Sequence, residues 1–168
     1  PTGLTAVTGN TQASLTWVAP TATGGSPVID YLITVTPAIT GSPFHTNSAN
    51  TSFTVTGLTN GTSYVFRVQA INDFGNSESS TASNAIRPAG IPATPTGLVL
   101  TPGDGQVTAT WSAVTSLGGV SLGAYVIQTS TDGITWETPL AGTVTWANNS
   151  TSSTTATITG IPNGSAIF

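Results

Sequence analysis

The sequence predicts an all-β chain made of two tandem seven-stranded β-sandwiches, the second of them incomplete. The first observation is a repeat, because the tetrapeptide Pro-Thr-Gly-Leu at residues 1–4 returns at residues 95–98. Trp17 returns as Trp111, and Tyr31 returns as Tyr125, at the same offset. A fixed period of this size indicates two copies of one module. We therefore expect one domain over residues 1–90 and a second over residues 91–168.

Short runs of alternating apolar and polar residues, separated by turn residues, are the second observation. In the run at residues 13–17, Ala13, Leu15 and Trp17 share one face, as expected for a strand that is buried on one side. Asn60-Gly61 favours a tight turn because both residues tolerate positive φ. Seven strands are expected in the first copy: residues 3–7, 13–17, 31–35, 44–47, 53–55, 64–71 and 77–86.

The second copy follows the first only in part. The sequence Gly-Leu-Thr-Asn-Gly at residues 57–61 returns as Gly-Ile-Pro-Asn-Gly at residues 160–164, later than the period predicts. We therefore expect an insertion within residues 142–155. Counterparts of the strands at 64–71 and 77–86 are missing from the second copy. The expectation is that the chain continues beyond Phe168 or that another chain donates a strand there.

Composition excludes several classes of partner. Only 5% of residues are charged, and Arg67 and Arg87 are the only lysine or arginine residues, so the net charge is −4. Nucleic acid is not expected as a partner because phosphate binding depends on lysine and arginine. No apolar run approaches the roughly 20 residues that cross a bilayer, so membrane insertion of this segment is not expected. The chain has no cysteine, which excludes disulfides and thiolate metal sites.

One stretch resembles a known family in both order and spacing. Residues 58–75 contain the pattern Leu-x-Asn-Gly-Thr-x-Tyr-x-Phe-x-Val-x-Ala-x-Asn-x-x-Gly, and Pro1, Leu4, Trp17 and Tyr31 precede it. This pattern resembles the fibronectin type III family of immunoglobulin-like sandwiches. The resemblance implies that Tyr64 forms a tyrosine corner, with its hydroxyl bonded to the backbone near Leu58. It also implies that Trp17, Tyr31 and Leu58 are core residues, and that Ile167 replaces the corner tyrosine in the second copy.

Residues suited to catalysis are scattered. His45 is the only histidine, and no serine stands in a nucleophile-elbow pattern beside it. The six carboxylates occur singly, whereas a glycosidase needs a pair and a calcium site needs a cluster. We therefore predict no catalytic, metal-binding or cofactor-binding residues, and no cofactor.

Aromatic residues outside the expected core are the candidates for contact with a partner. Trp136 and Trp146 have no equivalent in the first copy, and Phe74 lies in the loop after the strand at 64–71. Such side chains could anchor a protein or stack on a sugar ring. The alternative is that the two tryptophans pack together and hold the insertion down. Asn148 and Asn149, in the insertion, are the candidate glycosylation sites.

These observations together favour a non-catalytic module over an enzyme. We expect a structural or adhesive repeat of a secreted or cell-surface protein, acting as a spacer and an assembly surface, in a setting such as a filament or surface array. Its partners would be protein, through self-association or neighbouring repeats, or polysaccharide. The alternative is an accessory linker or carbohydrate-contacting module of an extracellular polysaccharide-degrading enzyme.

Overall fold

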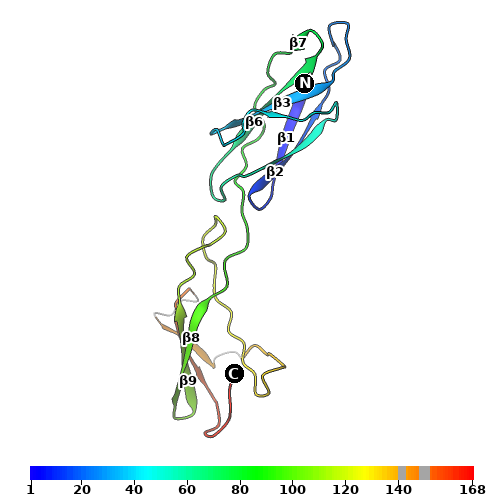
Figure 1. Ribbon diagram of the computed structural model, residues 1–168. Coiled ribbons are helices and arrows are strands. Elements are labelled where there is room, and N and C mark those ends of the chain that lie inside the picture. The colour runs from blue at the N-terminus through cyan, green and yellow to red at the C-terminus, as the bar shows by residue number, and fades with distance from the viewer. Residues whose placement is uncertain (140–142, 148–151) are drawn as a thin grey trace. The chain divides into compact units, whose positions relative to one another are not determined.

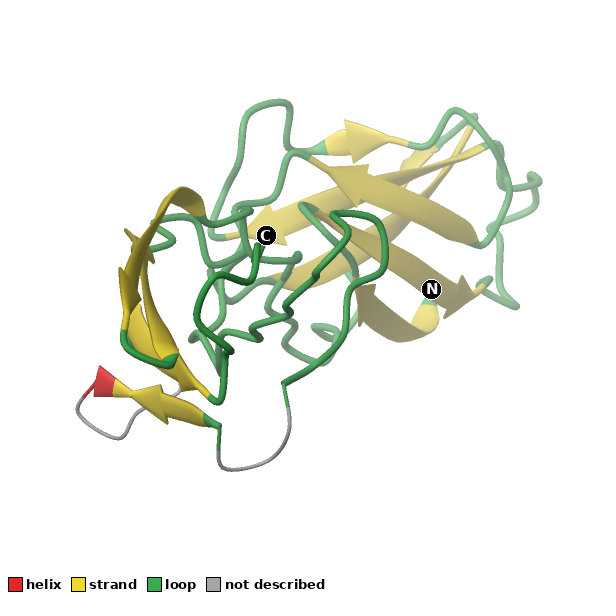
Figure 2. Ribbon diagram, turned by 90° about the horizontal axis from the view of Figure 1, so that it is seen from below, coloured by secondary structure: helices red, strands yellow, loops and turns green. Residues whose placement is uncertain are grey.

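The computed structural model describes residues 1–139, 143–147 and 152–168. The chain divides into two compact units. Unit 1 comprises Pro1–Ile91 and Gly118–Val120, and unit 2 comprises Pro92–Leu117 and Ser121–Phe168. Strands are drawn as arrows in Figure 1, and Figure 2 separates them by colour from the loops.

Unit 1 is a sandwich of a three-stranded and a four-stranded antiparallel sheet, in the order β1-β2-β5 and β4-β3-β6-β7. The predicted fold class is therefore confirmed for this copy, with seven strands in two layers. The strands are β1 (Thr2–Thr8), β2 (Gln12–Val18), β3 (Asp30–Thr36), β4 (Phe44–His45), β5 (Ser52–Thr56), β6 (Val65–Asn72) and β7 (Gly75–Asn76).

The core of unit 1 lies between its two sheets and follows the alternation of the sequence. Along β2, Ala13, Leu15 and Trp17 are buried while the residues between them are exposed. From the facing sheet, β3 contributes Tyr31 and Ile33 to the same cluster. Successive side chains of a strand point to opposite faces. Alternating apolar and polar residues therefore determine which face of each strand is turned toward the core.

A tyrosine corner joins β5 to β6, as the sequence predicts. The Tyr64 hydroxyl oxygen accepts a hydrogen bond from the Thr59 backbone N–H at 3.1 Å. In the same corner, Asn60 Oδ1 accepts a hydrogen bond from the Thr11 N–H at 2.9 Å. The first bond lies within the segment between β5 and β6, and the second connects that segment to the turn between β1 and β2.

The segment at residues 77–86 differs from the expected regular strand. Ser77, Ser80 and Ser83 each donate a backbone N–H to a β6 carbonyl, and each hydroxyl accepts the N–H of that same β6 residue. The serines recur every three residues, whereas their partners Ala70, Val68 and Phe66 recur every two. A strand repeats every two residues, so this segment is not a strand. Its serine N–H groups and hydroxyls instead supply hydrogen-bond partners for the backbone C=O and N–H groups of β6.

Unit 2 contains one four-stranded antiparallel sheet, in the order β10-β11-β9-β8. Its strands are β8 (Thr96–Gly103), β9 (Gln106–Ser112), β10 (Val144–Trp146) and β11 (Thr155–Thr159). The layer expected to face this sheet contains one isolated bridge among the described residues, between Thr129 and Glu137. The buried cluster is correspondingly small, with Val107, Ala109 and Ile158 at its centre.

Strand β10 lies within the predicted insertion and has no counterpart in unit 1. It pairs with the edge of β11, with Thr145 opposite Thr157. The strand of unit 1 that corresponds to β11 is β5, which pairs with β2 on one side only. The insertion therefore adds a strand to an edge that unit 1 leaves open.

Candidate functional site

Phe74 is held at the tip of a tight turn between β6 and β7. Asn72 pairs with Gly75 across the turn, so only Asp73 and Phe74 lie between the paired residues. The Phe74 N–H donates to Asn72 Oδ1 at 2.9 Å, and Ser26 Oγ donates to Asp73 Oδ2 at 2.9 Å. These bonds hold the turn against the β2–β3 loop while the Phe74 side chain stays 82% exposed.

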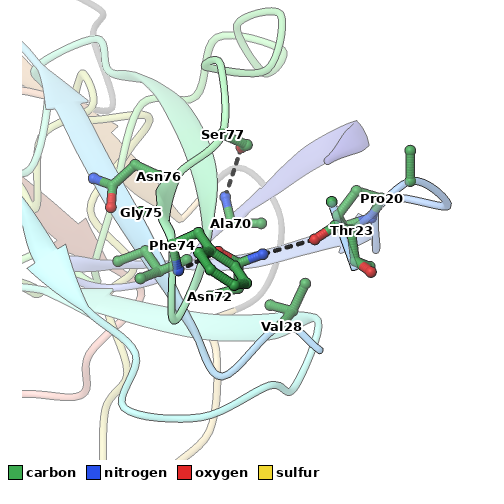
Figure 3. A pocket seen from close by; sticks show the side chains of 12 residues that line it. Pro20, Thr23, Val28, Ala70, Asn72, Phe74, Gly75, Asn76 and Ser77 are labelled. Carbon is green, nitrogen blue, oxygen red and sulfur yellow. Dashed lines mark hydrogen bonds between the residues drawn. The ribbon is translucent and has the colours of Figure 1, made fainter. Parts of the chain in front are cut away.

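A hollow of about 280 Å³ lies beside Phe74 in unit 1 (Figure 3). The β2–β3 loop contributes Pro20 and Val28 to its lining, and the β6–β7 hairpin contributes Ala70, Phe74 and Asn76. The Asn72 side chain spans the two walls, because its Nδ2 donates to the Thr23 carbonyl at 2.6 Å. An exposed ring beside a hollow, on loops joined by hydrogen bonds, is a geometry suited to a protein contact.

The other two candidate aromatics occupy different environments in unit 2. Trp146 is partly buried, and its ring meets that of Trp111 edge to face, with centroids 6.1 Å apart. Trp136 is 48% exposed and lines a hollow of about 240 Å³ together with Tyr125, Ile127 and Phe168. Trp146 therefore packs against Trp111, whereas Trp136 presents much of its ring to solvent.

The side chains of His45 and Asp30 lie in hydrogen-bonding contact at the edge of the four-stranded sheet of unit 1, with His45 Nδ1 2.5 Å from Asp30 Oδ2. Burial alone would raise the pKa of Asp30. Hydrogen bonds with His45, Thr46 and the Tyr31 backbone outweigh this effect and hold the pKa below its usual range. Within the described residues, no three His, Cys, Asp or Glu side chains gather into a group that could hold a metal ion.

Asn148 and Asn149, the candidate glycosylation sites, lie outside the described residues. Two other asparagines in Asn-x-Ser/Thr sequences have structural partners. Asn60 Nδ2 donates to Asn10 Oδ1, and Asn163 Nδ2 donates to Asp104 Oδ1, each at 2.8 Å. Both side chains connect a corner to the turn between the first two strands of their unit.

Asn84 is a residue that the sequence reasoning missed. Its side chain donates to the Ala6 carbonyl and accepts the Ala6 N–H, both at 2.9 Å. The Thr8 hydroxyl also donates to the Arg87 carbonyl, and the Ala89 N–H donates to the Gly9 carbonyl. The spacing of serines 77, 80 and 83 was the available signal that this segment departs from a regular strand.

A match to a protein-family model agrees with the architecture of unit 1. The family model described as fibronectin type III domain matches residues 1–86. These residues form a sandwich with a tyrosine corner, which places the molecule among the immunoglobulin-like β-sandwich modules. The chain belongs to the fibronectin type III family.

Curated relatives are matched over the first copy. The chain is 39% identical over 80 residues to the M-protein of striated muscle from Gallus gallus, covering 46% of this chain and 6% of that protein. It is 42% identical over 78 residues to the Kelch domain-containing protein SSO1033 from Saccharolobus solfataricus, covering 46% of this chain and 11% of that protein. The chain thus spans about a tenth or less of the length of these relatives.

Among solved structures, the chain is similar to domains A168–A170 from titin, with 31% identity and a TM-score of 0.44. That match covers 52% of this chain and 30% of the titin chain. The FN1–FN3 domains of chicken CNTN1 match with 22% identity and a TM-score of 0.47, covering 82% of this chain and 50% of theirs. In the part of the chain that the structure describes, no helix has the length and apolar character needed to span a membrane.

Proposed function

We propose that this chain is a non-catalytic structural and adhesive module of a larger secreted or cell-surface protein. In this role it acts as an in-line spacer and offers a protein-contact surface. Membership of the fibronectin type III family supports a module of this kind. The arrangement of the first and last segments of unit 1 is the observation that carries the spacer role.

Chain entry and exit in unit 1 lie at opposite ends of β1. The chain enters before Thr2, and the Ala89 N–H reaches the Gly9 carbonyl just beyond the end of β1. Contacts from Ala6 to Asn84 and from Thr8 to Arg87 connect β1 to the last segment, which runs in the same direction. Tension applied along the chain would therefore pull β1 and the last segment past each other, so that these hydrogen bonds share the force. We expect this resistance to unfolding in a module that acts as a spacer.

Single-molecule force spectroscopy on the 168-residue chain tests the spacer role. We expect unit 1 to unfold in one discrete step, and Asn84→Ala to lower the unfolding force. Asn76→Ala is the matched control, because Asn76 is exposed in the β6–β7 hairpin, away from β1. Unfolding without a discrete step, or equal forces for the two variants, would contradict the proposal.

Phe74 is proposed as the anchor of the protein contact. A phage-displayed peptide library panned on the chain provides a defined probe, and we expect the enriched peptides to carry apolar side chains. Binding should be lost with Phe74→Ser and retained with Val18→Ser, which removes another apolar side chain that is 60% exposed. Equal binding of the selected peptides to both variants would exclude Phe74 as the anchor.

A second candidate function, contact with carbohydrate in an accessory module of a polysaccharide-degrading enzyme, is favoured by one residue. Trp136 combines 48% exposure with a position beside a hollow in unit 2. Trp146 is less suited, because its ring packs against Trp111. Retention on insoluble polysaccharide should fall with Trp136→Ala and change less with Trp146→Ala, and unchanged retention in both variants would remove this candidate.

A further inference from the structure

Strand edges expose unpaired backbone N–H and C=O groups, and proteins usually protect them with short strands, bulges, prolines or charges. Unit 1 lies wholly within the described residues, and three of its four edges carry such protection. The Asn84 side chain caps β1 at Ala6, and the register of β1 also shifts between Thr2 and Thr5. Strand β4 has two residues and follows Pro43, and β7 has two residues before the irregular segment at 77–86.

The edge of β5 carries none of these protections. The strand has five residues, all uncharged and none of them proline, and it pairs regularly with β2. The Thr51 carbonyl accepts the Trp17 N–H at the start of this pairing. Because antiparallel ladders alternate, the backbone groups of Ser52, Thr54 and Thr56 face the open side.

In unit 2 the corresponding edge, on β11, is paired with the additional strand β10. In β11, Thr155, Thr157 and Thr159 hold the same positions opposite β9 as Ser52, Thr54 and Thr56 hold opposite β2. The Thr159 N–H donates to the Thr143 carbonyl at 2.8 Å, next to β10. The position equivalent to Thr56 is therefore hydrogen-bonded on its outer side in unit 2.

The composition of β10 indicates which strand fits the edge. Thr145 stands between Val144 and Trp146, and it lies opposite Thr157 with its side chain on the outer face. Strand β5 has the same pattern, because Thr54 is exposed between the partly or fully buried Phe53 and Val55. A second β5, running antiparallel, would place Thr54 opposite Thr54 and so reproduce the Thr145–Thr157 pair.

We propose that two copies of this chain associate by antiparallel pairing of their β5 edges, forming one continuous sheet from two three-stranded sheets. The arrangement has twofold symmetry, the commonest symmetry of protein dimers, and supplies about six backbone hydrogen bonds. Strands β1, β2 and β5 contain no Asp, Glu, Lys or Arg, so these strands bring no like charges together. The interface is small, and association is therefore weak and suited to arrays in which many copies are held close together.

This inference goes beyond the proposed spacer role and Phe74 contact, because it concerns a different surface from Phe74 and Asn84. The force and peptide experiments above use variants outside β5. The experiments below change β5 alone, so failure of the edge pairing leaves the spacer role and the Phe74 contact standing.

Cysteine cross-linking of the full chain tests the pairing directly, since the chain contains no cysteine of its own. Directly paired residues in an antiparallel hydrogen-bonded pair have Cα atoms about 5.5 Å apart, within the range that a disulfide spans. We expect Thr54→Cys to form a covalent dimer at least about tenfold faster than Thr5→Cys, because association raises the local thiol concentration. Thr5 is the matched control on the β1 edge of the same sheet.

Sedimentation equilibrium supplies the second measurement. The Thr54 N–H faces the open side, so Thr54→Pro removes no hydrogen bond to β2, and edge strands accept proline at such positions. We expect the wild-type chain to self-associate at high concentration, and Thr54→Pro to remain monomeric with an unchanged melting profile for unit 1. Equal cross-linking of the two cysteine variants, or equal self-association of wild type and Thr54→Pro, would overturn the proposal.

Discussion

The ring of Trp17 meets that of Tyr31 edge to face in unit 1, with centroids 5.0 Å apart and planes inclined by 69°. The repeat reproduces this relationship in unit 2, where the Trp111 and Tyr125 centroids are 5.2 Å apart at 75°. Burial differs between the pairs, because Trp17 is only 5% exposed whereas Trp111 is only partly buried. The same two residue types thus build a complete core in one unit and a partly covered one in the other.

Trp17→Ala should destabilise unit 1 severely. Truncation of a buried tryptophan costs about 3–5 kcal/mol, which is a large share of the stability of a single domain. Trp111→Ala should cost less, because its side chain is only partly buried. Urea unfolding followed by circular dichroism provides the measurement, and a Trp17→Ala chain in which unit 1 unfolds like the wild type would refute the core assignment.

Tyr64→Phe should weaken the corner without disrupting the fold. The substitution removes only the hydroxyl that accepts the Thr59 N–H, so we expect a loss of about 0.5–1.5 kcal/mol in the free energy of unfolding. The chemical-denaturation midpoint of unit 1 should fall while the denaturant slope stays constant. An unchanged midpoint would show that the corner bond contributes no net stability.

Ser80→Ala should lower the free energy of unfolding by more than the removal of one oxygen atom suggests. The Ser80 hydroxyl accepts the buried Val68 N–H at 3.1 Å, and loss of that acceptor should cost about 1–3 kcal/mol. Ser79→Ala is the matched control, because Ser79 is the exposed neighbour. Native-state hydrogen exchange at Val68 should accelerate only in Ser80→Ala. Equal exchange in both variants would show that the hydroxyl does not protect this amide.

Acid should destabilise unit 1 partly through Asp30. Its pKa is lowered in the folded state, so its contribution to stability is present above the unfolded pKa of about 4 and is lost as pH falls through the folded pKa. In Asp30→Asn, the decline in urea midpoint between pH 5 and the acid limit, on the order of pH 2, should be shallower than in the wild type. Glu78→Gln, at an exposed carboxylate on the irregular segment, is the control. A wild-type slope in Asp30→Asn would contradict this role.

Much of unit 1 could be predicted from local pattern. The alternation through Trp17 and the Asn60-Gly61 turn predicted strand faces and a corner, because side-chain direction and positive φ are local properties of the backbone. The resemblance located the hydroxyl of Tyr64. The prediction of a regular last strand was wrong, since serine side chains replace strand geometry there and their partners lie in β6.

The environments of the candidate contact residues could not be predicted from local sequence pattern. Phe74, Trp136 and Trp146 all stand out in the sequence, but their environments depend on residues distant in the chain. Trp146 meets Trp111, Phe74 projects from a turn held by Ser26 and Asn72, and Trp136 lines a hollow with Phe168. Burial of an aromatic ring is set by such partners, which residue type alone does not specify.

The amino-acid sequence was sufficient to establish the repeat, the all-β class and the core face of strands such as β2, because these follow from periodicity and from the intrinsic preferences of residues. Only the tertiary structure showed that Asn84 caps the edge of β1, that β10 covers the edge of β11, and that the edge of β5 stays open. Edges and caps are formed by backbone groups that meet across long sequence separations. Which of these backbone groups pair depends on their positions in the folded chain, and a local sequence pattern does not determine those positions.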